Sequence, residues 1–76
     1  MKIRDFETCH KLFIERLREY IKTKNVNVET FAKSVEISPR TVYAWLKKET
    51  IPGMEHLTGL AQKLGWSAGY LIGIEE

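Results

Sequence analysis

The sequence predicts an all-α protein, a compact bundle of five short helices, and three observations support that class. Apolar residues recur at spacings of three and four in five successive segments, which is the period of an amphipathic helix. No segment alternates apolar and polar residues as a half-buried strand does. The breaks between segments are only a few residues long, as in small helical bundles. We therefore expect helices at about residues 8–23, 28–35, 39–48, 54–64 and 67–73.

The first predicted helix, at about residues 8–23, has one apolar stripe and an opposite charged face, as expected of a surface helix. Asp5 or Thr8 is its candidate N-cap, because either side chain can accept a hydrogen bond from the first turn. The polar stretch at residues 25–27 ends it. The apolar stripe consists of Phe6, Cys9, Phe13, Leu17 and Tyr20, and we expect Cys9 to be an inert core thiol.

The second and third predicted helices have clear start signals. Asn27 is the candidate N-cap of the second helix, and Glu29 in its first turn complements the helix dipole. Ser38 is the candidate N-cap of the third helix, and Pro39 falls at its first position, where a missing N–H has no cost. The second helix has one apolar face, formed by Val28, Phe31, Ala32 and Val35.

The last two predicted helices are separated by Gly65, which suits the position just past a helix C-terminus. Ser67 is the candidate N-cap of the short fifth helix. The apolar residues are Leu57, Leu60, Ala61 and Leu64 in the fourth helix and Tyr70, Leu71 and Ile74 in the fifth.

Length and composition exclude several functional classes. The chain has 76 residues, 43% hydrophobic and 29% charged, and we expect a single domain over residues 1–76. No apolar run could span a bilayer, and no secretory signal is visible, so we expect a cytoplasmic protein without a membrane. Cys9 is the single cysteine, which excludes an internal disulfide, and His10 and His56 lack ligand spacing. We expect no metal, no cofactor and no enzyme, since no catalytic pairing or phosphate-binding loop is supported by a motif.

The second and third helices together form the most informative pattern. About three residues join them, and Ala32 lies where one helix would cross the other. A small side chain at this position lets the two backbones approach at a steep angle. This is the geometry of a helix-turn-helix.

On a helical wheel the third helix separates into two faces. Val42, Trp45 and Leu46 form a buried stripe, and the opposite side carries Arg40, Ala44 and Lys47. We call that side the outward face; Thr41, Tyr43 and Lys48 flank it, and it contains no acid. Such a face can enter the major groove, where arginine pairs with guanine and small or hydroxyl side chains approach other base edges.

The charge distribution is uneven. Residues 11–48 hold nine basic and four acidic residues, a net of +5, whereas the remainder has a net of −3. This pattern suits a polyanion, although a solvated surface of mixed charge is the alternative that charge alone leaves open.

Three stretches share their order and spacing with a known family: VETFAKSVEISPRTVYAWLKK, then IP, then HLTGLAQKLGWSAGYLIG. They contain a Phe31-Ala32 pair, an Ile-Ser pair before the third helix, and Val42 three residues before Trp45. Through these residues the chain resembles the Cro/CI-type (XRE-like) helix-turn-helix family of phage repressors and bacterial regulators. The resemblance covers about residues 14–74.

The resemblance implies a lambda-repressor-like DNA-binding domain and a transcriptional regulator, in particular a repressor. Its partner would be a double-stranded DNA operator, bound by a homodimer. Together with the wheel, the resemblance predicts base reading by Arg40, Thr41, Tyr43 and Ala44. Phosphate contacts are predicted for Asn27, Lys33, Ser38, Lys47 and Lys48, and dimer contacts for Tyr70, Ile72 and Ile74.

The chain departs from the family pattern at four positions. Val28 stands where a phosphate-binding glutamine is common, and Pro39 stands where some members have a base-contacting side chain. Glu36 and Lys48 occupy positions that favour glycine, so a left-handed backbone at Glu36 would cost about 1 kcal/mol or more.

Three alternatives stay open at this point. The bundle could be an antitoxin-like or adaptor module that chiefly binds a protein. The regulator could activate rather than repress transcription. The chain could be whole, or the N-terminal domain of a longer protein.

Overall fold

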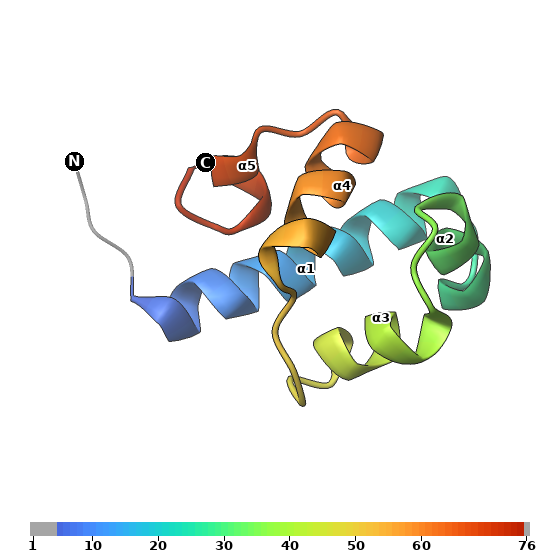
Figure 1. The fold of residues 1–76 in the computed structure, drawn as a ribbon, viewed down its shortest axis with the longest axis horizontal. Helices are drawn as coiled ribbons and strands as arrows, with labels where there is room; N and C mark the ends of the chain where they lie inside the picture. Colours follow the sequence, from blue (N-terminus) through green and yellow to red (C-terminus); the bar gives the residue numbers. More distant parts are fainter. Residues whose placement is uncertain (1–4, 76) are drawn as a thin grey trace.

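The structure is a computed structural model that describes residues 5–75. It is all-helical over this range, which confirms the predicted fold class. Figure 1 shows α1 running lengthwise through the molecule, with α3 on one side and α4 and α5 on the other. The five helices are α1 (Phe6–Lys24), α2 (Val28–Ser34), α3 (Pro39–Leu46), α4 (Met54–Leu64) and α5 (Ala68–Leu71).

The starts of α1 and α2 follow from side-chain caps. The Asp5 carboxylate accepts a hydrogen bond from the Thr8 backbone N–H at 2.7 Å, so Asp5, not Thr8, is the cap. This is why α1 begins two residues before the predicted start. The Asn27 side chain caps α2 in the same way, accepting from the Thr30 N–H at 2.8 Å.

Three helices are shorter than predicted: α2 ends one residue early, at Ser34, and α3 and α5 lose two or more residues. α3 ends at Leu46, because Lys47 leaves the helical region and Lys48 has a left-handed backbone with φ 62°. α5 covers Ala68–Leu71, with Ser67 as its N-cap outside the helix, and Gly73 turns the chain at φ 87°.

The core gathers around α1 and α3. Leu17, Val42 and Trp45 are at most 1% exposed, and the Trp45 ring meets the Phe13 ring edge-on, with centroids 5.9 Å apart. Burial of Val42, Trp45 and Leu46 confirms the predicted inner stripe of α3. The full buried set is Phe13, Ile14, Leu17, Ile21, Phe31, Ala32, Val35, Val42, Trp45, Leu46, Leu60 and Leu71.

The predicted apolar stripe of α1 is wrong at its beginning. Phe6 is 60% exposed and Cys9 is half-buried, because the first turns of α1 extend past the elements that cover the rest of the helix. Both residues instead line an apolar hollow of about 300 Å³, shared with the α3–α4 connection and the C-terminal segment. The other lining residues of this apolar hollow are His10, Phe13, Ile51, Pro52, Leu57, Ile72 and Ile74.

Two arginines of α1 contact other helices: Arg16 contacts α5, and Arg18 contacts α3. The Arg16 guanidinium lies 3.9 Å from the centroid of the Tyr70 ring and also donates to the Tyr70 carbonyl. Arg18 donates to the carbonyl of Leu46 at 3.4 Å, at the C-terminus of α3. Trp66 packs edge-on against Tyr70 of α5, with ring centroids 5.1 Å apart.

Candidate nucleic-acid interface

The turn between α2 and α3 is tight and is closed by backbone hydrogen bonds. Ala32 is fully buried, which permits the close approach of the two helices. The Ile37 N–H donates to the Ala32 carbonyl at 2.9 Å, and the Glu36 N–H donates to the Lys33 carbonyl at 3.1 Å. Glu36 takes the left-handed conformation, at φ 59°, that the sequence predicted to be costly for a residue other than glycine.

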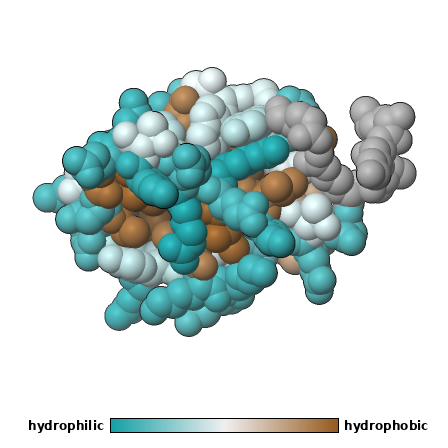
Figure 2. Space-filling view, turned by 180° about the vertical axis from the view of Figure 1, so that it is seen from behind, coloured by the Kyte–Doolittle hydropathy of each residue, from teal (hydrophilic) through white to brown (hydrophobic). Residues whose placement is uncertain are grey.

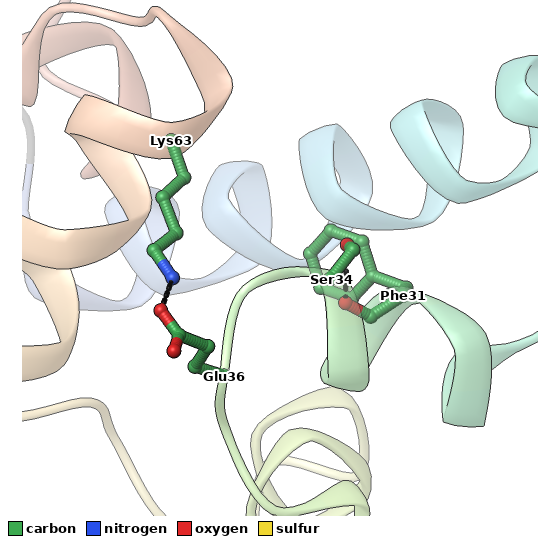
Figure 3. Close-up of polar contacts among 4 residues, drawn as sticks. All are labelled: Phe31, Ser34, Glu36 and Lys63. Atoms are coloured by element: carbon green, nitrogen blue, oxygen red, sulfur yellow. Dashed lines mark hydrogen bonds and ion pairs between the residues drawn. The ribbon is translucent and has the colours of Figure 1, made fainter.

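An ion pair ties this turn to α4. Figure 3 shows the Lys63 side chain reaching from α4 to the Glu36 carboxylate. The hydrogen bond from Lys63, together with its charge, holds the pKa of the Glu36 carboxyl below its ordinary value. At the end of α2, the Ser34 hydroxyl donates to the Phe31 carbonyl at 2.7 Å (Figure 3).

The start of α3 leaves a hydroxyl outside the helix. Ser38 occupies the predicted N-cap position, but its side chain makes no capping hydrogen bond. Pro39 follows at the first helical position, where no N–H needs a cap. Ser38 is exposed, so its hydroxyl can meet a phosphate that approaches this end of α3.

The structure brings the predicted base-reading residues together on one surface. Arg40 and Tyr43 are exposed, and Thr41 and Ala44 lie beside them. Arg40 and Ala44 form a ridge between two shallow depressions, because both residues line each of them. Tyr43 and Lys47 border one depression and Thr41 borders the other.

The basic residues of this surface form no ion pair within residues 5–75. No ion pair or hydrogen bond of the side chains of Arg40, Lys33, Lys47 or Lys48 occurs there. All four are exposed. A cation without a protein partner is free to neutralise a phosphate or to donate to a base.

The arrangement of α2, the turn and α3 agrees with a match to a known family. The family model described as helix-turn-helix, HTH_3, matches residues 17–71, well over half of the chain. The chain belongs to the HTH_3 helix-turn-helix family. This match confirms the resemblance to Cro/CI-type (XRE-like) regulators. No curated protein and no solved structure matched the chain.

Membership in this family makes the protein a DNA-binding helix-turn-helix regulator. The family is a regulatory rather than an enzymatic one. In the described part of the chain, no three His, Cys, Asp or Glu side chains gather as metal ligands. No described helix is both long and apolar enough to cross a bilayer.

The outward face of this HTH_3 domain is less purely basic than the wheel predicted. Glu49 lines the same depression as Arg40 and Lys47. The Tyr43 hydroxyl donates to the Glu29 carboxylate of α2 at 3.1 Å. A wheel of α3 alone could not reveal either acid, because one lies on another helix and the other follows the end of α3.

The Tyr43–Glu29 contact also changes the chemistry of the phenol. Loss of hydration, the hydrogen bond to Glu29 and the charge of that carboxylate together raise the pKa of Tyr43 above its ordinary value. The phenol is the donor in this hydrogen bond, and the raised pKa reflects the stabilisation of its protonated form.

The three predicted dimer residues do not form one patch. Ile72 and Ile74 line the apolar hollow, and Ile74 is 55% exposed. Tyr70 instead lines a separate depression with Trp66 and Arg16, and its ring and carbonyl are engaged by Arg16. Sequence reasoning missed Arg16 because its partner is 54 residues away and no local pattern marks the pair.

Proposed function

We propose that this protein is a sequence-specific, double-stranded DNA-binding transcriptional repressor that inserts α3 into the major groove. The observation that carries the proposal is the two-sided α3. Val42, Trp45 and Leu46 anchor one side in the core, and the other side presents Arg40 and Lys47 without protein partners in the described range. A helix that is anchored in the core and presents unpaired basic side chains suits recognition of a DNA groove.

Each residue of the surface has a role in this proposal. Arg40 donates two hydrogen bonds to a guanine, Thr41 contacts a neighbouring base edge, and Ala44 allows close approach to a thymine methyl group. The Tyr43 ring stands at the edge of the same base contacts. Phosphates are bound by Asn27, Lys33, Ser38, Lys47 and Lys48.

The proposal includes a homodimer on a near-palindromic operator. Ile72 and Ile74 supply its contacts through the apolar hollow, together with the exposed rim residues Phe6 and Ile51, which are 60% and 57% exposed. Repression then follows from occupation of the operator, and the protein acts in the cytoplasm of a prokaryotic cell. The Tyr70 ring is expected to contribute less, since Arg16 and Trp66 already pack against it.

One observation favours a second candidate, an antitoxin-like or adaptor module. The same apolar hollow could accept an apolar segment of a different protein instead of a second copy. The two candidates differ in whether the purified chain alone selects a two-part DNA site.

A selection from a random duplex library at near-physiological salt tests the proposal. The purified protein is expected to enrich an inverted repeat whose half-sites lie about one helical turn apart. A single enriched half-site would contradict the dimer but retain the DNA reader. Retention without sequence enrichment, lost as salt rises, would leave only backbone electrostatics and favour the adaptor module.

A further inference from the structure

The hydrogen bond between Tyr43 and Glu29 joins the outward face of α3 to the first turn of α2. The Tyr43 hydroxyl lies 3.1 Å from the Glu29 carboxylate, and Tyr43 is 37% exposed. It is the one side-chain hydrogen bond among the described residues that links α2 to α3. It fixes the position of a negative charge at the border of the surface on which the proposed function places DNA.

Glu29 stands close to the expected path of the DNA backbone. It lies two residues after Asn27, which caps α2 and is a predicted phosphate contact. Lys33 of the same helix is exposed and forms no ion pair with Glu29 within residues 5–75. A carboxylate in this position repels phosphates, whatever the base sequence, because the DNA backbone is uniformly charged.

Resting on the proposed function, we propose that Tyr43 is a positioning residue for Glu29: its hydroxyl holds the carboxylate against α3 and away from the DNA backbone. Glu29 then weakens DNA binding by repelling the phosphates, and the hydrogen bond from Tyr43 reduces this repulsion. The Tyr43 hydroxyl affects binding through Glu29 and does not itself contact a base or a phosphate.

A direct DNA contact by the Tyr43 hydroxyl predicts a different pattern of mutational effects. If the hydroxyl touched DNA, its removal would weaken binding by the same factor with or without a charge at position 29. If it acts by restraining the carboxylate, its removal has an effect only while that charge is present. The two mechanisms therefore separate in a double-mutant cycle.

The experiment compares the wild-type chain, Glu29→Gln, Tyr43→Phe and the double variant. Each protein is titrated with the operator obtained by selection and with an unrelated duplex, over a range of salt concentrations. Glu29→Gln keeps an oxygen that Tyr43 can bond to but removes the charge. Glu15→Gln is the matched control, because it removes an exposed acid that lines the α1 depression beside Trp66 rather than the surface of α3.

Glu29→Gln is expected to tighten binding to both duplexes by about two- to fivefold and to steepen the salt dependence by up to about one unit. Tyr43→Phe is expected to weaken binding by about twofold or more in the wild-type background and to have almost no effect in the Glu29→Gln background. Glu15→Gln should leave both affinities within about 1.5-fold of wild type.

Three results would overturn the inference. An equal loss from Tyr43→Phe in both backgrounds would show a direct contact of the hydroxyl with DNA. Equal affinities of Glu29→Gln and Glu15→Gln would show that Glu29 is not near the phosphates. A wild-type chain that binds neither duplex would overturn the proposed function as well, whereas the first two results leave that function intact.

Discussion

The outward face of α3 and the apolar hollow beside α1 are both exposed, but their side chains differ in kind. The outward face presents Arg40 and Lys47, whose side chains form no ion pair and no hydrogen bond in the described range. The apolar hollow presents Phe6, Ile51 and Ile74, each more than half exposed. The outward face suits a polyanion, because binding to a polyanion depends on positive charge. The apolar hollow suits another apolar surface, such as that of a second copy of the chain.

The two surfaces meet in the connection between α3 and α4. Ile51 lines the apolar hollow and also the depression that holds Arg40 and Thr41. A second copy that covers the apolar hollow would therefore stand next to the outward face of α3. In the proposed homodimer, this neighbourhood would fix the separation of the two α3 helices. Figure 2 shows that, on the face opposite to that of Figure 1, hydrophobic residues emerge in gaps among hydrophilic side chains.

The largest predicted effect is a loss of fold stability, which would disrupt both surfaces at once. Trp45 is 1% exposed and packs edge-on against Phe13, so Trp45→Ala should destabilise the fold by about 3–5 kcal/mol. Thermal and urea denaturation measure this loss. Met54→Ala is the control, since Met54 is 78% exposed and should change stability by less than about 0.5 kcal/mol. Equal stability of the two variants would contradict the assignment of Trp45 to the core.

A charge in the apolar hollow should separate dimerisation from DNA recognition. Ile74→Lys is expected to weaken binding to a two-half-site operator by about tenfold, because linked binding of two copies is lost. Binding to a single half-site should stay unchanged. Gln62→Lys makes the same charge change on the exposed surface of α4 and serves as the control. An unchanged two-site affinity for Ile74→Lys would place the dimer contacts elsewhere.

A smaller effect is expected from the loss of a single phosphate contact on the outward face of α3. Lys47→Ala should weaken binding to all duplexes by a few-fold and lower the salt slope by about one unit, without a change in preferred sequence. Titrations at several salt concentrations give both quantities. A change in the preferred base at one position would instead make Lys47 a base reader.

The smallest predicted effect concerns the strained residue after α3. Lys48 has a left-handed backbone at φ 62°, so Lys48→Gly should raise the free energy of unfolding by about 0.5–1 kcal/mol. The same change should lower the salt slope of DNA binding, since a predicted phosphate contact is lost. Lys47→Gly is the matched control, because Lys47 has φ −89° and gains no relief. If both glycine variants lost stability, the left-handed backbone at Lys48 would not be a source of strain.

Local patterns accounted for most of the fold. Caps such as Asn27, the proline at position 39 and the apolar spacing of α3 act within a few residues, and the sequence alone revealed them. The length of α3 was overestimated because a lysine at position 48 suits the last turn of a helix, so the family's preference for glycine there did not shorten the predicted helix. Burial of Phe6 was expected from its spacing, which carries no information on where α1 passes the end of the core.

The site was predicted only in part, for the same reason. The wheel grouped Arg40, Ala44 and Lys47 correctly because they share one short segment. The Glu29–Tyr43 contact joins α2 to α3, and the Glu36–Lys63 contact joins the turn after α2 to α4. The two partners are separated in the sequence by 14 positions in the first contact and by 27 in the second, so they become neighbours only after the helices pack. Sequence reasoning consequently described the charge of α3 but not the acids that packing brings beside it.

The most direct test of α3 as the DNA reader is a second library selection with Arg40→Ala, compared with the wild-type chain under the same conditions. Arg40 lies on the ridge of the outward face, and its loss should cost about 1–3 kcal/mol on the wild-type operator. The enriched inverted repeat should keep its spacing but lose the preference at one base position in each half-site. An unchanged motif would contradict the placement of Arg40 against a base and, with it, the proposed orientation of α3 in the major groove.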